Sequence, residues 1–405
     1  MHNRSRTFGR VAALDAHRPA FCRPTEFEIA AGWVHGVLPM SPPPETPLSP
    51  RAALEAAILP TVVAGHCMVS FSGGRDSSAV LALATHLARR EGVPLPVPVT
   101  EVFHGVESTD EARWQRLVIE HLGIRDWIRL PVDRDGDLVG DAAAASLLRR
   151  GLLSLPALHT KDALLSAARG GTMLTGEGGD EVLGARRITP LTLMLRMRRP
   201  LSRRLVRACA MSGAPAPVRR AVVRSELRRT GDRAWMNPEA ARTHRKLLAA
   251  DEAAEPLPWH QAVWWLKHRR AVHLGLRDYA LIAAEHDVDL RHPLLDDGFL
   301  AALAHSGGRW GFAGRTALMR ILFADLLPDE LLRRSSKASF DRAYMSDATR
   351  EFARSWDGLG VDPTLVDVAT LRAGWLSDRP AAVTGLLLQS AWLATRTETV
   401  PGRPR

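Results

Sequence analysis

The sequence predicts an α/β protein, in which a parallel sheet covered by helices on both faces precedes a mostly helical C-terminal half. Strand-like apolar runs alternate with amphipathic helix-like runs across residues 51–190, which is typical of a parallel sheet with crossover helices. From about Pro190 onward the pattern is almost entirely helical. We therefore divide the chain into a loop-rich segment 1–50, an α/β part 51–190 and a helical part 191–405.

The elements of the α/β part are expected in alternating order. Strands are expected around Val69 and over 94–104, 127–132 and 172–175. Helices are expected over 51–64, 76–88, 110–122 and 147–168, where apolar residues recur at helical spacing. In such a sheet, ligands bind at the carboxyl ends of the strands. Any functional motif is therefore expected just after a strand.

Composition and charge exclude several classes of protein. Nearly half of the 405 residues are apolar, which suffices for a sizeable core. No run of about 18 apolar residues occurs, and the first residues show no apolar signal-like run, so we expect a cytoplasmic protein without a membrane partner. Three widely separated cysteines fit neither a disulfide framework nor a zinc site.

A first glycine-rich turn interrupts the chain after the strand around Val69. Glycines follow this apolar run, and an amphipathic run starts at about Asp76. Glycine lets the backbone approach an anion closely, and the first turn of a helix offers free N–H groups. A carboxylate here would repel a bare phosphate, so we expect Mg²⁺ between Asp76 and the phosphates. An ordinary capped glycine turn is the alternative. The residues expected to bind phosphate are Ser72, Gly73, Gly74, Asp76 and Ser77.

A second glycine-rich turn, T-G-E-G-G-D-E, occupies residues 175–181 directly after another expected strand. Its acids should face the same crevice as the first turn, which makes Asp180 a natural second Mg²⁺ ligand opposite Asp76. Glu177 is a candidate to orient or deprotonate a nucleophile, and Gly176 is assigned to the pyrophosphate-binding surface. A glycine turn with solvated acids is the alternative interpretation.

Together these motifs resemble a known family. The string S-G-G-x-D-S resembles the pyrophosphate loop (PP-loop) of ATP pyrophosphatases, and no Walker P-loop string occurs. With G-E-G-x-D-E about a hundred residues later, the chain is similar to the synthetase domain of asparagine synthetases. Relatives of that group include β-lactam synthetases and lasso-peptide macrolactam synthetases. The resemblance covers roughly residues 51–345 and implies an adenine nucleotide alpha hydrolase-like fold that uses ATP and Mg²⁺. Three further segments agree with it, at residues 107–111, 288–296 and 327–340.

Lys337 lies in the last of these segments, and it is one of four lysines beside fifty arginines. A compact ammonium group can donate to developing negative charge or hold a phosphate oxygen. We assign Lys337 a catalytic role, stabilising the oxyanion when an amine attacks an acyl-adenylate. A surface lysine is the alternative.

The departures from the family shape the functional hypothesis. The chain begins Met1-His2 rather than Met-Cys, and fifty residues are too few for a glutaminase domain, so no ammonia from glutamine is expected. We predict an AMP-forming carbon–nitrogen ligase that adenylates a carboxylate and joins it to an amine, with peptide macrolactam formation, as in lasso-peptide cyclisation, favoured. An ammonia-dependent asparagine synthetase-like amidotransferase is the alternative. A tRNA-modifying ATP pyrophosphatase is a third, more remote functional hypothesis.

The positive charge is concentrated in one segment. Residues 196–229 hold eleven arginines and one acid, Glu226. The net charge of this segment, +10, equals that of the whole chain. This segment is predicted either to bind a polyanion or an acidic peptide, or to be a solvated face. The expected partners of the enzyme are a peptide or small-molecule substrate that supplies the carboxylate and the amine, with a precursor peptide and its leader-processing proteins as further candidates. Nucleic acid is not expected as a partner.

Overall fold

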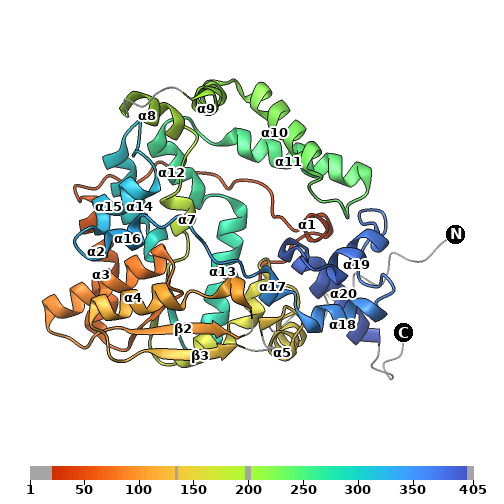
Figure 1. Cartoon of the computed structure of the whole chain (residues 1–405), viewed down its shortest axis with the longest axis horizontal. Coiled ribbons are helices and arrows are strands. Elements are labelled where there is room, and N and C mark those ends of the chain that lie inside the picture. Colours follow the sequence, from red (N-terminus) through yellow and green to blue (C-terminus); the bar gives the residue numbers. More distant parts are fainter. Residues whose placement is uncertain (1–20, 105, 133–135, 197–201, 399–405) are drawn as a thin grey trace.

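The computed structural model describes residues 21–104, 106–132, 136–196 and 202–398. Within them, five strands form one parallel sheet in the order β3-β2-β1-β4-β5. Figure 1 labels β2 and β3, which lie side by side. This sheet confirms the predicted fold class. The strands are β1 Cys67–Ser70, β2 Val97–Phe103, β3 Ile128–Val132, β4 Thr172–Leu174 and β5 Asp289–Arg291.

The fifth strand was not predicted. It lies in the part of the chain that was expected to be almost entirely helical, and it pairs with β4 through residues 289–291. A strand of three residues has no periodicity that could separate it from the helices around it. It forms because the chain returns to the open edge of the sheet after a long helix.

Helices surround the sheet in the α/β part of the chain. Asp76 lies in the first turn of the helix that follows β1, and Gly74 is the N-cap of that helix. The helices of this part, with the N-terminal helix, are α1 Glu26–Ala31, α2 Pro50–Ala64, α3 Arg75–Glu91, α4 Ala112–Leu122, α5 Asp141–Arg150, α6 Asp162–Ala167, α7 Gly179–Val182 and α8 Thr189–Arg196.

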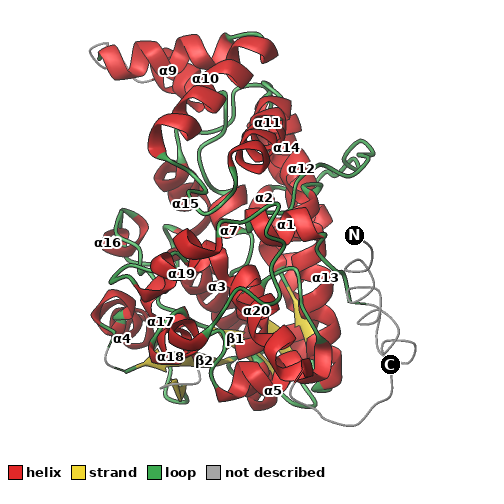
Figure 2. Ribbon diagram, turned by 90° about the vertical axis from the view of Figure 1, so that its right-hand side faces the viewer, coloured by secondary structure: helices red, strands yellow, loops and turns green. Residues whose placement is uncertain are grey.

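The rest of the described chain is helical apart from β5. Its helices are α9 Arg203–Gly213, α10 Ala216–Thr230, α11 Pro238–Ala254, α12 Trp259–Lys267, α13 Arg270–Glu285, α14 Asp297–Gly307, α15 Arg315–Phe323, α16 Asp329–Leu332, α17 Asp341–Tyr344, α18 Asp347–Ser355, α19 Val368–Leu376 and α20 Gly385–Glu398. Figure 2 shows α9 and α10 at one end of the molecule, far from the strands. No helix in the described residues is long and apolar enough to cross a bilayer.

One predicted helix was wrong. The helix expected over 147–168 is two helices, α5 and α6, joined by a loop and the short 3₁₀ segment Pro156–Thr160. Gly151 ends α5 with φ of 70°, a left-handed conformation that favours glycine. Pro156 then starts the 3₁₀ segment, where its missing N–H costs nothing.

The apolar core forms on both faces of the sheet. Val69 of β1 packs with α2, α3, α12 and α14 on one face, while its neighbour Met68 packs with α6 and α13 on the other. This alternation is the two-residue period of a strand. A third cluster joins α1, α5 and α11 to α18, α19 and α20. The strand ends are therefore held between two helical layers.

Candidate active site

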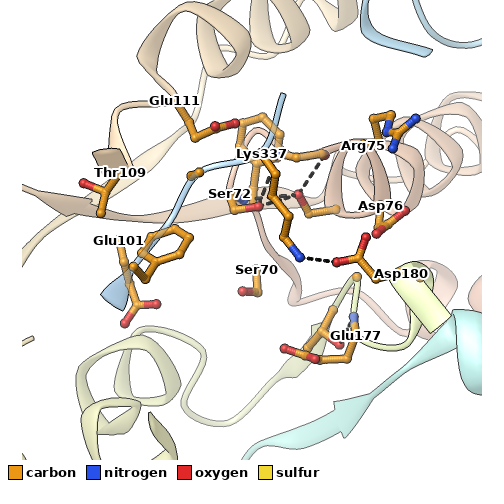
Figure 3. A pocket seen from close by; sticks show the side chains of 18 of the residues that line it. Ser70, Ser72, Arg75, Asp76, Glu101, Thr109, Glu111, Glu177, Asp180 and Lys337 are labelled. Carbon is orange, nitrogen blue, oxygen red and sulfur yellow. Dashed lines mark hydrogen bonds and ion pairs between the residues drawn. The ribbon is translucent and has the colours of Figure 1, made fainter. Parts of the chain in front are cut away.

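A cavity of about 610 Å³ opens at the carboxyl ends of the strands. Both glycine-rich turns line it, as does the segment that carries Lys337 (Figure 3). A second hollow of about 530 Å³ adjoins it beyond the end of β2, because the two share Glu101, Phe103, Thr109, Glu111 and Gln115. All of the site residues selected from the sequence except Gly73 line the main cavity.

The first turn is tied together by its own hydroxyl groups. Ser72 and Ser77 have their Oγ atoms 3.1 Å apart, and the Ser72 Oγ also accepts from the Gly74 N–H at 3.3 Å. Gly73 has φ of 85°, and a Cβ there would lie 2.7 Å from Cγ of Gln115. Glycine is required at this position both for its conformation and for the space. The turn thus presents serine hydroxyls and the N-terminus of α3 to the cavity.

The second turn packs directly on the first. A Cβ on Gly176 would lie 2.6 Å from the backbone nitrogen of Ser77, and a Cβ on Gly179 would lie 2.6 Å from Cβ of Asp76. Real side chains do not approach so closely. Gly178, with φ of 83°, lies against Leu295 of the 288–296 segment. The glycines therefore allow the two acidic turns to close around one space.

Arg315, at the start of α15, joins the two turns. Its Nη2 atom lies 2.6 Å from both carboxylate oxygens of Asp76, and its Nη1 donates to Asp180. Lys337 donates to the other oxygen of Asp180. Asp76 and Asp180 are thus brought close enough for one guanidinium to bridge them. The sequence analysis missed Arg315, because one arginine among fifty carries no local signal.

The donor set around this guanidinium fits Mg²⁺ bound together with a nucleotide. Mg²⁺ is usually held by one or two carboxylates plus substrate phosphates, and two carboxylates that share one cationic partner are such a pair. Within the described residues, no group of three or more His, Cys, Asp or Glu side chains could hold a metal ion without added ligands. Phosphate oxygens of a nucleotide and water would supply the remaining ligands of a bound Mg²⁺.

The three acids of the site differ in their pKa. Burial raises the pKa of Asp76 even though Arg315 opposes that shift. Burial also works against ionisation of Asp180, but the hydrogen bonds from Lys337 and Arg315 outweigh it and lower the pKa of that carboxyl. The side chain of Glu177 is exposed to the cavity. The surrounding protein nevertheless desolvates its carboxylate and raises its pKa, with a further contribution from the charge of Glu181. The pKa of Glu177 and that of Asp76 are thus raised, while that of Asp180 is lowered.

A buried ion pair anchors the segment that carries Lys337. The guanidinium of Arg334 binds both carboxylate oxygens of Glu111, and both side chains are about 5% exposed. Arg334 also donates to the Gly73 carbonyl at 3.3 Å and stacks over Trp114 at 4.7 Å. Lys337 itself is three-quarters exposed at the mouth of the cavity. The ion pair therefore positions an exposed lysine by fixing its neighbours.

The sequence analysis also missed a group of residues at the end of the cavity near β2. Lys161 Nζ lies 2.5 Å from Oε2 of Glu101, and Tyr279 and Tyr344 line the same region. No motif marks them, since they come from four separate elements. By contrast, Arg291 of the 288–296 segment is exposed, pairs with its neighbour Asp289 and does not line the cavity.

A parallel sheet with two acidic glycine turns at its strand ends defines a nucleotide-binding α/β protein. The family model for asparagine synthase matches residues 51–384, and the chain therefore belongs to this family. It is a family of AMP-forming carbon–nitrogen ligases, which use ATP and typically Mg²⁺. A search of curated protein sequences finds no match to this chain.

Proposed function

We propose that this ligase adenylates a carboxylate of a peptide and closes a macrolactam with an amine of the same peptide. The ammonia-dependent amidotransferase remains the alternative. The observation that carries the adenylation step is the closure of both glycine turns around one cavity, with Asp76 and Asp180 on a shared cation. The adjoining hollow beyond β2 supports a substrate larger than ATP and a small acid.

Each group of the site has a proposed task. The hydroxyls of Ser72 and Ser77 and the free N–H groups at the start of α3 hold the pyrophosphate. Mg²⁺, when held by Asp76 and Asp180, would neutralise charge on the phosphates. The substrate carboxylate attacks the α-phosphorus, giving an acyl-adenylate and pyrophosphate.

The second half of the reaction joins the amine to the activated acyl group. The amine nitrogen attacks the acyl carbon, AMP leaves, and Glu177 accepts the proton that the amine loses. Lys337 donates to the oxyanion that forms at the acyl oxygen, a task for which its exposed position at the cavity mouth is suitable. Holding amine and acyl-adenylate together contributes roughly 7 kcal/mol or more to the lowering of the barrier.

The products distinguish the candidate reactions. The chain is incubated with Mg-ATP and a candidate peptide whose carboxylates carry ¹⁸O, and the nucleotide and peptide are analysed by mass spectrometry. Macrolactam formation predicts AMP that carries ¹⁸O and a peptide that has lost one water. Labelled AMP with replacement of a hydroxyl by an amino group, dependent on added ammonium, would support the alternative. Formation of ADP would contradict both.

We further propose that the arginine-rich segment receives an acidic part of the peptide. Its exposed arginines on α9 and α10 form a surface that we call the basic face. None of them pairs with a carboxylate among the described residues, whereas Arg219 is buried and donates to the Ala214 and Ala253 carbonyls. Arg198 and Arg199 lie outside the described residues. The basic face consists of Arg203, Arg204, Arg207, Arg220, Arg224, Arg228 and Arg229.

Salt dependence tests this proposal. Binding of a fluorescein-labelled acidic peptide, measured by anisotropy, is expected to weaken steeply as ionic strength rises, because exposed charges are screened. The double variant Arg220→Ser/Arg224→Ser, which alters the groove between α10 and α11, should weaken binding, and the exposed Arg113→Ser on α4 should not. Equal binding by all three proteins, or a flat salt response, would show a solvated face.

A further inference from the structure

The end of the cavity near β2 gathers residue types that are rare in this chain. Both tyrosines of the protein, Tyr279 and Tyr344, line it, together with one of the four lysines. Figure 3 shows Glu101 on one side of the cavity and Asp76 and Asp180 on the other, with Glu177 between them. We call the group Glu101, Lys161, Tyr279 and Tyr344 the β2 cluster.

The charges of the β2 cluster leave a position for a cation. Lys161 neutralises Glu101, and each of these two side chains is about 15% exposed. The carboxylate of Glu177 feels the charge of Lys161 but forms no ion pair with any described residue. Glu177 is exposed and lines the cavity, so its carboxylate is open to pair with a cation that enters there. A positively charged group between Glu101 and Glu177 would balance the site.

The polar atoms of the β2 cluster are not satisfied within the protein. Among the described residues, neither tyrosine hydroxyl makes a hydrogen bond, although Tyr279 is only 5% exposed. Buried phenols normally find a partner. Lys161 directs one of its three protons to Glu101. The two phenols and the remaining lysine protons are therefore available to a bound molecule.

Aromatic rings form the wall beside these charges. The ring centroids of Phe103 and Phe340 are 5.4 Å apart, and Tyr344 lies 6.1 Å from Phe340 and 6.4 Å from Phe103. All three line the cavity. Aromatic faces attract organic ammonium groups, and their apolar surface favours the carbon substituents that ammonia lacks. The phosphates of a nucleotide, by contrast, would be repelled by the net negative charge that Glu177 adds to the neutral pair of Glu101 and Lys161.

We propose that the β2 cluster is the subsite for the amine substrate and that it selects an organic primary amine, bound as its ammonium ion between Glu101 and Glu177. This inference rests on the proposed function, for which it names the acceptor class. Lys161 is a positioning residue that fixes Glu101. Its positive charge also favours loss of the first of two protons, which the ammonium ion releases to water at the open cavity to become a nucleophilic amine; Glu177 accepts the second as the amide forms.

The two tyrosines allow a direct test. The full chain is prepared with ring-¹³C-labelled tyrosine, so that every labelled ring reports on this cluster. Glycinamide, which carries a free α-amine, is titrated with and without Mg²⁺ and α,β-methylene ATP, and N-acetylglycinamide and ammonium chloride serve as comparisons. Glycinamide should shift the tyrosine signals saturably, ammonium should bind at least about tenfold more weakly, and the acetylated compound should have no effect.

Two variants distinguish an amine subsite from an adenine-binding pocket. Glu101→Gln should weaken glycinamide binding about tenfold, as expected when a charged hydrogen-bond partner is lost. Glu120→Gln, an exposed position on α4 outside the cavity, should bind like the wild type. Equal shifts from the acetylated compound, or unchanged glycinamide binding by Glu101→Gln, would overturn the proposal. So would a tenfold loss of nucleotide affinity in that variant, which would assign the cluster to adenine. Glycinamide binding by a protein that binds no nucleotide would refute only the proposed ligase function.

Discussion

Replacing Gly179 by alanine tests whether the two glycine turns must close on each other. The added methyl group would lie 2.6 Å from both Cβ and Oδ2 of Asp76, whereas non-bonded carbon atoms pack at about 3.5 Å or more. The methyl group would lie closer still to Cγ of Asp76, so that side chain must withdraw by more than about 1 Å. Because Gly179 does not have a positive φ, the substitution adds a steric conflict without backbone strain.

The expected losses of stability and of nucleotide affinity follow from the steric conflict and from the displacement of the Asp76 carboxylate. Overpacking of this kind costs about 1–3 kcal/mol of folding free energy. A charged interaction contributes about 1.5–3 kcal/mol, so its loss should weaken Mg²⁺-dependent nucleotide binding about 10- to 100-fold. Isothermal titration calorimetry with α,β-methylene ATP measures the affinity, and urea unfolding measures the stability.

Gly213→Ala is the matched control, since a Cβ at that position meets no atom within 4 Å. This control should bind nucleotide like the wild type. If folded Gly179→Ala protein keeps its nucleotide affinity within about twofold, a difference of less than 0.5 kcal/mol, the close contact of the turns does not position Asp76, and the reasoning fails.

Three further variants test the surrounding structure. Arg334→Met should lower the free energy of unfolding in urea by about 3–5 kcal/mol, because it leaves the buried Glu111 carboxylate unpaired. Adding Glu111→Leu to this variant should recover part of the lost stability. If the double variant instead loses the sum of the two single losses, the two side chains do not stabilise each other. Lys337→Ala removes only an exposed contact to Asp180, so stability should change by less than about 0.5 kcal/mol. Its amide formation, assayed by mass spectrometry with a reactive peptide, should nevertheless fall about 100-fold or more, and full activity would exclude its catalytic role. Burial lowers the pKa of His159 to about 3 from 6.5. Below pH 6.5 the unfolded chain binds a proton that the folded chain does not, so stability should fall as pH falls towards 3, by up to about 1.4 kcal/mol per pH unit. His159→Leu should show a flatter profile in urea unfolding between pH 6.5 and 4, and an unchanged slope would contradict this assignment.

The parts of the fold that are local in the sequence could be predicted from it. Four of the strands and both glycine-rich turns follow from runs of residues that are contiguous in the chain. The break between α5 and α6 was missed, although Gly151 and Pro156 mark it, because the apolar spacing on either side continues as if one helix spanned both. The strand β5 is too short for a pattern, and its place depends on an open sheet edge that only the folded chain provides.

Prediction of the candidate site from the sequence is limited in the same way. Asp76 and Asp180 stand in recognisable strings, and the structure places them on one guanidinium. Arg315 has no such string, since its role arises only where α15 meets both turns. The β2 cluster is assembled from β2, the residue before α6, α13 and α17, so no spacing along the chain relates its members. The one signal in the sequence was that tyrosine and lysine are rare in this chain. That signal indicates a functional site only after the structure has shown that these residues line one cavity.

The central claim is that two carboxylates from separate turns hold one Mg²⁺ against the phosphates of a single nucleotide. A crystal structure of the chain with Mg²⁺ and α,β-methylene ATP tests it most directly. The account predicts one metal ion in contact with Asp76, Asp180 and phosphate oxygens, with Arg315 no longer bridging the two carboxylates and the phosphates lying against the 72–77 turn. A nucleotide bound elsewhere, or one bound with Arg315 still joining Asp76 to Asp180 and no metal between them, would contradict it.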